Sequence, residues 1–182
     1  MENKSIIIFA SGNGRNAENI MRYFADSSLA EVTSVLTNNP EAGVRGVAEE
    51  ESIANEIVDF AIADEQHVSD EMAATLQRYD VEMICLAGFM RKIPAEITRR
   101  YHDKILNIHP SLLPSYGGKG MYGHHVHAAV LAAGKKESGI IIHLVDEIYD
   151  NGKILFQARC PVEPDDTIER LLALVGWLLQ SL

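Results

Sequence analysis

The sequence predicts an α/β protein with a Rossmann-like fold, in which a mainly parallel sheet has helices on both faces and ends in an antiparallel pair of C-terminal strands. Short apolar runs at 5–10, 32–36, 57–60 and 83–87 are separated by stretches of helical periodicity. This alternation is typical of βαβ units and a parallel sheet. The length of 182 residues suits one domain, so we expect a single domain over residues 1–182.

Two of the intervening stretches have an apolar face of the kind that covers a sheet. The first face comprises Ala17, Ile20, Met21 and Phe24, and the second comprises Val126, Ala129, Val130 and Ala133. A third helix is expected near the C-terminus, where Asp166 is a suitable N-cap residue with Glu169 three positions later. The apolar stripe of this third helix contains Ile168, Leu171, Leu172, Val175 and Leu179.

The pattern changes in the last third of the chain. Segments 139–145 and 153–162 are predicted to be antiparallel strands joined by a short polar turn that contains Asp150, Asn151 and Gly152. The later segment alternates apolar and polar positions, which suits a half-exposed strand near the edge of the sheet. The segment 110–123 is long, irregular and rich in Gly and Pro, and such loops in compact domains are often functional.

Composition and charge argue against several classes of protein. Apolar residues make up 47% and charged residues 23%, as in ordinary globular proteins. The net charge of -10 argues against a nucleic-acid or anionic-membrane surface, because phosphate backbones select for basic stripes. The apolar run at 6–10 is too short for an export signal or a membrane span. We therefore expect no nucleic-acid partner and no membrane association, although a small phosphorylated substrate is still allowed.

The cysteines and the C-terminal segment bear on compartment and assembly. Cys85 lies in an apolar run and Cys160 in an alternating strand pattern, so we expect buried, reduced thiols and a cytoplasmic protein. The last helix has more apolar positions than one stripe requires, which makes a homodimer contact a hypothesis. The apolar tail that suggests this contact contains Trp177, Leu178, Leu179 and Leu182.

Asn107, His109 and Asp150 are the candidate catalytic residues. Asn107 and His109 are separated by one residue at the end of a predicted strand, so both side chains should leave the same side. Asp150 lies in the turn between the late strands, and a carboxylate beside an imidazole favours its protonated form and orients it. On the residues alone, a lone histidine at a strand end is more often a hydrogen-bonded structural residue, and a plain β-turn at 150–152 is also open.

Two loops that follow strands are candidate binding segments. Ser11-Gly12-Asn13-Gly14-Arg15-Asn16 leads from the first strand into a helix, and its backbone N–H groups at the helix N-terminus favour a phosphate. A plain tight turn would look similar, although Arg15 favours an anion. Segment 86–94 follows the fourth strand, and its apolar side chains could pack against a flat heterocycle or simply close the core.

Three histidines at 124, 125 and 127 suggest metal binding only superficially. Their spacing lacks the usual helical ligand pair at four residues, and no Cys or acidic residue lies nearby in sequence. We expect no metal, and we expect these histidines to start a solvated helix or one at the rim of a substrate site.

Four motifs in order resemble the formyltetrahydrofolate-dependent formyltransferases. They are Ser-Gly-Asn-Gly-Arg-Asn at 11–16, Leu-Ala-Gly-Phe-Met-Arg at 86–91, Asn-Ile-His-Pro-Ser-Leu-Leu-Pro at 107–114, and Asp-x-Gly at 150–152. The resemblance covers nearly the whole chain, from Ile6 to about Val162. It implies a single-domain formyltransferase fold and an enzyme that transfers the formyl group of 10-formyltetrahydrofolate to the amine of glycinamide ribonucleotide in de novo purine biosynthesis.

The resemblance also implies a role for each candidate segment. Asn107, His109 and Asp150 match the catalytic trio of the family. Gly14, Arg15 and Asn16 match the loop that holds the phosphate of the ribonucleotide. Met90, Arg91, Lys92 and Ile93 match the segment that lines the folate pocket. 10-Formyltetrahydrofolate would serve as co-substrate, and no metal would be needed.

This sequence departs from the family at two places. Position 15 usually holds a small hydroxyl residue, so Arg15 would add charge to the phosphate loop. Family members of this type continue into a helix that grips the ribonucleotide with charged residues, whereas here Glu169 and Arg170 are the last charged residues. Either Glu169 and Arg170 replace those contacts, or part of the ribonucleotide site is missing.

Three alternatives share the same catalytic core. The first is a formyltetrahydrofolate deformylase, although such enzymes usually carry an additional N-terminal domain and this chain begins at its first strand. The second is methionyl-tRNA formyltransferase, which needs a basic tRNA-binding domain that an acidic chain lacks. The third is a non-catalytic folate or nucleotide binder, suggested by the altered C-terminus.

Overall fold

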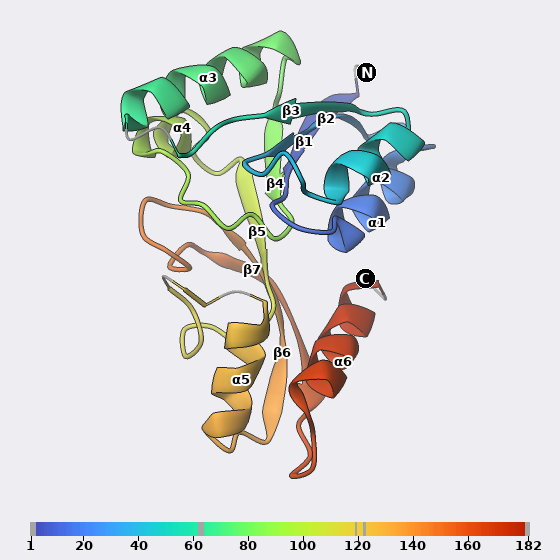
Figure 1. The fold of residues 1–182 in the computed structure, drawn as a ribbon, viewed down its shortest axis with the longest axis vertical. Helices are drawn as coiled ribbons and strands as arrows, with labels where there is room; N and C mark the ends of the chain where they lie inside the picture. The colour runs from blue at the N-terminus through green and yellow to red at the C-terminus, as the bar shows by residue number, and fades with distance from the viewer. Residues whose placement is uncertain (1–2, 62–63, 119, 122, 181–182) are drawn as a thin grey trace. The chain divides into compact units, whose positions relative to one another are not determined.

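A computed structural model describes residues 3–61, 64–118, 120–121 and 123–180 (Figure 1). The chain divides into two compact units, Met1–Leu106 and Asn107–Leu182. The expectation of a single domain over the whole chain stays a prediction.

The first unit is a series of βαβ units. Its elements are β1 (Lys4–Phe9), α1 (Arg15–Phe24), β2 (Ala30–Thr37), α2 (Val44–Glu50), β3 (Ala54–Ile57), α3 (Glu65–Arg78), β4 (Met83–Leu86), α4 (Ala95–Arg100) and the start of β5 (Ile105–His109). The strand order is β3-β2-β1-β4-β5, and β1, β2, β3 and β4 pair in parallel. The predicted mainly parallel α/β sheet is therefore confirmed.

Both faces of the sheet in the first unit are covered. Ile8 of β1 packs in one apolar cluster with Ala17 and Met21 of α1. Its neighbours Ile7 and Phe9 point to the other face and are fully buried, as is Met72 of α3. Figure 1 shows α1 and α2 together on one side of these strands and α3 on the other. Burial on both faces explains why β1 is a continuous apolar run.

The second unit contains the predicted antiparallel strands. Its elements are the end of β5, α5 (His124–Ala132), β6 (Glu137–Leu144), β7 (Ile154–Pro161) and α6 (Ile168–Gln180). The strand order is β5-β6-β7, and β6 pairs with β7 in antiparallel orientation. Val130 of α5, Ile140 of β6 and Leu171 of α6 share one buried cluster. As predicted, β7 lies at the edge of the sheet.

Three local expectations are corrected by the structure. The strand expected at 57–60 is β3 at Ala54–Ile57, because β3 is an edge strand whose side chains need not be apolar. Thr167, rather than Asp166, caps α6, since its hydroxyl accepts a hydrogen bond from the N–H of Arg170. The connection between β6 and β7 is a long loop, 145–153, rather than a tight turn.

The two cysteines and the helices bear on the expected thiols and on the expected absence of a membrane span. Cys85 is half-buried and Cys160 is buried, and both are free thiols. Burial raises the pKa of Cys85 to about 11, so this thiol is un-ionised at neutral pH. No helix in the described part of the chain is long and apolar enough to cross a membrane. Leu182 and the side chain of Leu179, part of the proposed dimer contact, lie outside the described residues.

Candidate active site

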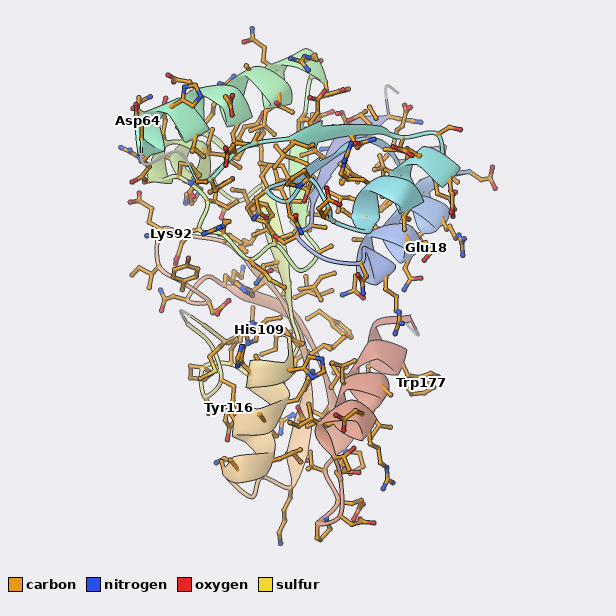
Figure 2. All side chains as sticks on the ribbon, in the orientation of Figure 1. Glu18, Asp64, Lys92, His109, Tyr116 and Trp177 are labelled. Carbon is orange, nitrogen blue, oxygen red and sulfur yellow. The ribbon has the colours of Figure 1, made fainter. Side chains whose placement is uncertain are left out.

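His109 is held at the end of β5 by a carbonyl and a carboxylate of its own unit. Its Nε2 lies 2.7 Å from the carbonyl oxygen of Tyr116, so this nitrogen carries a proton and donates it. Its Nδ1 faces Asp150 Oδ1 at 3.6 Å. The histidine is 3% exposed, so both contacts are largely shielded from water. Figure 2 shows His109 and Tyr116 near each other, beside α5.

Asp150 faces the imidazole and is fixed by the backbone. Its Oδ2 accepts a hydrogen bond of 2.7 Å from the N–H of Gly118. Its backbone has a φ of 52°, a left-handed conformation that aspartate tolerates better than most residues. A Cβ at Gly117 would lie 2.9 Å from the Cβ of Asp150, so glycine is required for this close approach.

Asn107 completes the predicted group and joins it to a fourth residue, His143. The Asn107 Nδ2 donates to Asp150 Oδ1 at 3.4 Å and lies 3.0 Å from His143 Nε2. His143 Nδ1 lies 2.8 Å from the carbonyl oxygen of Leu144 and must donate to it. In the neutral ring, His143 Nε2 is therefore the acceptor for Asn107. Both hydrogens of the Asn107 amide are thus engaged.

His143 is not among the site residues predicted from the sequence. It lies in the apolar strand β6, where a histidine gives no sign of a site. The pairing of β6 with β7 shifts register between Ile142 and His143, because Leu155 of β7 is skipped. Such bulges redirect side chains and are common next to active sites. In the sequence, His143 is visible only as a polar residue that directly follows the apolar run 140–142.

The direction of the His109 pKa corrects one expectation. We expected Asp150 to raise it, and the carboxylate does act in that direction. Burial has the larger effect, however, and the pKa of His109 lies below the usual 6.5. Burial alone would raise the pKa of Asp150, but contacts with His143, Gly118 and His109 together lower it. At neutral pH the free site therefore pairs a neutral imidazole with an ionised carboxylate.

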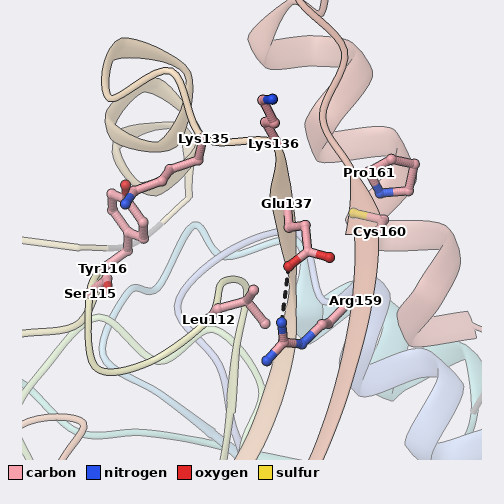
Figure 3. Close-up of a pocket in the computed structure, with 9 residues that line it drawn as sticks. All are labelled: Leu112, Ser115, Tyr116, Lys135, Lys136, Glu137, Arg159, Cys160 and Pro161. Carbon is pink, nitrogen blue, oxygen red and sulfur yellow. Dashed lines mark hydrogen bonds and ion pairs between the residues drawn. The ribbon is translucent and has the colours of Figure 1, made fainter.

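Tyr116, in the loop after β5, contacts His109 and also lines a cavity in the same unit. Tyr116 uses its carbonyl oxygen for His109 and accepts a second hydrogen bond there from Ser111 Oγ at 3.3 Å. Its side chain lines a cavity of about 710 Å³ together with basic residues such as Lys135 and Arg159 (Figure 3). None of Asn107, His109 and Asp150 lines this cavity.

The predicted phosphate loop lies in the first unit and has the required local form. Gly14 has a φ of 79°, and a Cβ there would lie 2.7 Å from the backbone of Val44, so only glycine fits. Arg15 begins α1 and is exposed, while Asn16 is half-buried. No side-chain cap occupies this helix start. Its free N–H groups and an exposed guanidinium suit an anion.

The predicted folate segment also lies in the first unit, and its side chains differ in exposure to solvent. Met90 is 48% exposed, and Arg91 and Lys92 are exposed as well. Ile93 is 4% exposed and belongs to the core, so its side chain is not presented to a ligand. Phe89 packs its ring against Phe9, with ring centroids 5.4 Å apart. Of the apolar side chains proposed to contact a heterocycle, Met90 is the accessible one.

The two charged residues near the start of α6 have local partners. Arg170 Nε forms an ion pair of 3.0 Å with Asp166. The pKa of Glu169 is lowered, chiefly by a hydrogen bond from its own backbone and by one from Thr167. Their suggested role in place of missing ribonucleotide contacts stays a hypothesis.

The histidines at the start of α5 do not all face solvent. His124 and His125 are exposed as expected, but His127 is 2% exposed, and its Nδ1 has no hydrogen-bond partner within the described part of the chain. Helical periodicity explains this, since His127 lies next to the buried Val126 and one turn before the buried Val130. Among the described residues, no group of three or more His, Cys, Asp or Glu side chains could hold a metal ion.

Acidification is expected to destabilise the protein through His127. Burial, with repulsion from His124 and His109, lowers the pKa of His127 from 6.5 to about 4. The unfolded chain therefore binds this proton first, and the stability contributed by the neutral ring is complete above pH 6.5 and lost as the pH falls to 4. We expect the stability of the wild type relative to His127→Gln to fall by about 3 kcal/mol between pH 7.5 and pH 4. Urea unfolding of both proteins at several pH values checks this, and a constant difference would contradict it.

Together, the fold and the site define an α/β protein in which a buried imidazole meets a half-buried carboxylate and a half-buried amide beside the end of a strand, an arrangement suited to acyl transfer. The formyl transferase family profile matches residues 4–175, and the chain belongs to this family. The resemblance noted in the sequence is thereby confirmed.

Named relatives agree with this assignment. The chain is 41% identical over 174 residues to the chloroplastic phosphoribosylglycinamide formyltransferase of Vigna unguiculata, covering 94% of this chain and 56% of the relative. The protein of the same name from Arabidopsis thaliana is 38% identical, with coverages of 92% and 59%. The chain thus spans less than two thirds of these plant proteins. The crystal structure of phosphoribosylglycinamide formyltransferase from Brucella melitensis matches with a TM-score of 0.88 and 36% identity, covering 99% of this chain and 91% of that one.

Proposed function

We propose that this protein transfers the formyl group of 10-formyltetrahydrofolate to the amine of glycinamide ribonucleotide, a step of purine biosynthesis. The observation that carries the proposal is the cluster of Asn107, His109 and Asp150. Oδ1 of Asp150 lies 3.6 Å from Nδ1 of His109 and 3.4 Å from Nδ2 of Asn107. Membership of the formyl transferase family supports the reaction class. The names of the relatives support the acceptor.

The proposed chemistry starts with attack of the ribonucleotide amine on the formyl carbon. A new C–N bond forms, and negative charge develops on the formyl oxygen. The C=O double bond then re-forms, and the bond from the formyl carbon to N10 of the folate breaks. N10 keeps the electron pair of that bond and takes up a proton. The proton that the amine loses balances the one that N10 gains, so neither metal nor redox cofactor takes part.

His109 is proposed to bind the developing oxyanion. Its Nε2–H donates to the carbonyl oxygen of Tyr116, so a formyl oxygen would have to take the place of that carbonyl. Asp150 faces the other ring nitrogen and would stabilise the imidazolium if the ring takes up a proton. We propose that Asp150 also orders a water that relays the proton from the amine to N10.

Asn107 is proposed to assist at the same oxygen. Of the two contacts of its Nδ2, the one to Asp150 Oδ1 is the longer, at 3.4 Å against 3.0 Å to His143. A hydrogen bond of 3.4 Å is weak, so this hydrogen can turn to the oxyanion at small cost. His143 would keep the amide oriented meanwhile.

Binding of the two substrates is assigned to loops of the first unit. We propose that Gly14, Arg15 and Asn16 hold the ribonucleotide phosphate through backbone N–H groups and the guanidinium. Met90, Arg91, Lys92 and Ile93 are proposed to line the folate site. Since the side chain of Ile93 is buried, its contribution would come from its backbone.

Arg15→Ala is expected to raise the Michaelis constant for glycinamide ribonucleotide about tenfold, because a charged hydrogen bond to phosphate is lost. The constant for the folate should change little. Steady-state kinetics with each substrate varied in turn measures both values. Arg22→Ala is the matched control, since Arg22 lies on the same helix and pairs with Glu18 and Glu51. An unchanged ribonucleotide constant in Arg15→Ala would remove Arg15 from the phosphate site.

The function itself is tested by following the formyl group. The purified protein is incubated with 10-formyltetrahydrofolate in the presence and absence of glycinamide ribonucleotide. Formylated ribonucleotide should appear in the first case, and the donor should be stable in the second. Donor consumption that does not depend on the ribonucleotide would identify a deformylase, and absence of both reactions would favour a non-catalytic binder.

The proposal includes a cytoplasmic protein that acts on small molecules and not on nucleic acid or membranes. The free thiols and the net charge of -10 support this. We further propose a homodimer that uses α6, where the side chain of Trp177 is 63% exposed. Sedimentation analysis of the wild type and Trp177→Glu would test the dimer.

A further inference from the structure

The side chain of Ser11 joins two loops of the first unit that the proposed function assigns to different substrates. Ser11 follows β1 and starts the loop that leads to Gly14. Its Oγ accepts a hydrogen bond of 2.8 Å from the N–H of Met90, and its own N–H donates to the carbonyl of Gly88 at 3.1 Å. These two hydrogen bonds connect the start of the loop that leads to Gly14 with the start of the predicted folate segment.

The same hydroxyl has a third partner. It donates to Oδ1 of Asn38, which follows the end of β2. A hydroxyl has a single proton, so the donor capacity of Ser11 is used within the protein. Ser11 is 8% exposed, and its environment is therefore that of a structural link rather than of a group presented to a ligand.

The backbone around Gly88 is shaped for this link. Gly88 has a φ of 79°, a left-handed conformation that lets the chain turn immediately after β4. The turn lets the Gly88 carbonyl and the Met90 N–H both bond to Ser11. Phe89, between them, packs against Phe9 and Phe60, which holds the turn from the other side.

We propose that Ser11 is a positioning residue that couples the binding of the ribonucleotide to the binding of the folate. The inference rests on the proposed function, and it assigns to Ser11 no contact with either substrate. A ligand that orders one loop fixes the hydroxyl, and the fixed hydroxyl holds the other loop in place. The second ligand then has less conformational entropy to remove, and the coupling is reciprocal.

Calorimetric titration measures this coupling without turnover. The ligands are glycinamide ribonucleotide and 5,8-dideazafolate, a folate analogue with no formyl group to transfer. In the wild type, saturation with either ligand should lower the dissociation constant of the other about fivefold. In Ser11→Ala the coupling factor should approach one, and each ligand alone should bind about threefold more weakly. Because the inference assigns Ser11 no contact with either substrate, the turnover number at saturation should stay within about twofold.

Three further variants separate coupling from a loss of stability. Ser34→Ala makes the same change at a fully buried serine of β2 whose hydroxyl has no hydrogen-bond partner among the described residues, so its coupling should equal that of the wild type. Asn38→Ala removes the acceptor of the Ser11 proton and should reduce coupling. Ser11→Thr keeps the hydroxyl and should retain coupling.

The possible outcomes distinguish the inference from the function beneath it. A wild type that binds neither ligand would overturn the proposed function, and this inference with it. A wild type that binds both ligands while Ser11→Ala retains the full coupling factor would overturn the inference alone. Equal loss of coupling in Ser11→Ala and Ser34→Ala would also overturn it, because a general loosening of the sheet would then be the cause.

Discussion

His109→Ala is expected to lower kcat/KM for formyl transfer by about a thousandfold, the largest effect of any single substitution considered. The imidazole makes the shorter of two hydrogen bonds to the Tyr116 carbonyl, at 2.7 Å against 3.3 Å from Ser111 Oγ, so we expect it to be the main donor to an oxyanion in the position of that carbonyl. General acid–base and electrostatic contributions of this kind are worth about 10²- to 10⁴-fold. Steady-state kinetics with both substrates measures the loss.

Loss of stability must be distinguished from loss of chemistry in this variant. Removing the ring leaves the Tyr116 carbonyl without one hydrogen bond, which costs about 1–3 kcal/mol of unfolding free energy. Thermal unfolding shows whether the variant is folded at the assay temperature. His67→Ala, at a half-exposed histidine of α3, is the control and should keep full activity. A folded His109→Ala protein with wild-type kinetics would exclude His109 from catalysis.

Asp150→Asn is expected to lower kcat/KM by about a hundredfold while preserving the fold. The amide oxygen can still accept from the N–H of Gly118, so the loop should keep its place. The negative charge that faces His109 is lost, and with it the contribution that raises the pKa of the imidazole. The imidazolium that forms during transfer is then less stable.

Two measurements check the Asp150 prediction. The activity assay gives the rate, and histidine NMR should show a further decrease in the pKa of His109. Asp146→Asn is the matched control, because Asp146 lies in the same loop and accepts hydrogen bonds from local groups, the N–H of Ile148 and the amide of Asn151. Equal activities of the two variants would show that the charge at position 150 has no special role.

Local patterns in the sequence were sufficient for the class of fold. Residues such as Ile7 and Ile8 form a continuous apolar run because both faces of β1 are buried, and that run is visible without coordinates. The alternation of apolar and polar residues in β7 was also visible without coordinates, and it indicated a strand near the edge of the sheet. β3 was misplaced because an edge strand of four residues has little apolar signal.

The candidate site was only partly predictable. Asn107 and His109 share a strand end, so their common side follows from the period of two along a strand. The position of the Asp150 side chain depends on the left-handed backbone conformation of Asp150 itself. It also depends on a hydrogen bond from Gly118, which lies far from it in sequence. His143 became part of the group through a register shift between β6 and β7, and no short-range pattern encodes such a shift.

The sequence by itself therefore determined the βαβ order, the family motifs and the identity of three candidate catalytic side chains. These properties depend on residue type and spacing along the chain. The tertiary structure decided the partners of those side chains, the burial of Ile93 and His127, and the sign of the His109 pKa shift. That sign is the outcome of desolvation opposed by one nearby carboxylate, and both depend on distances between residues that are remote in sequence.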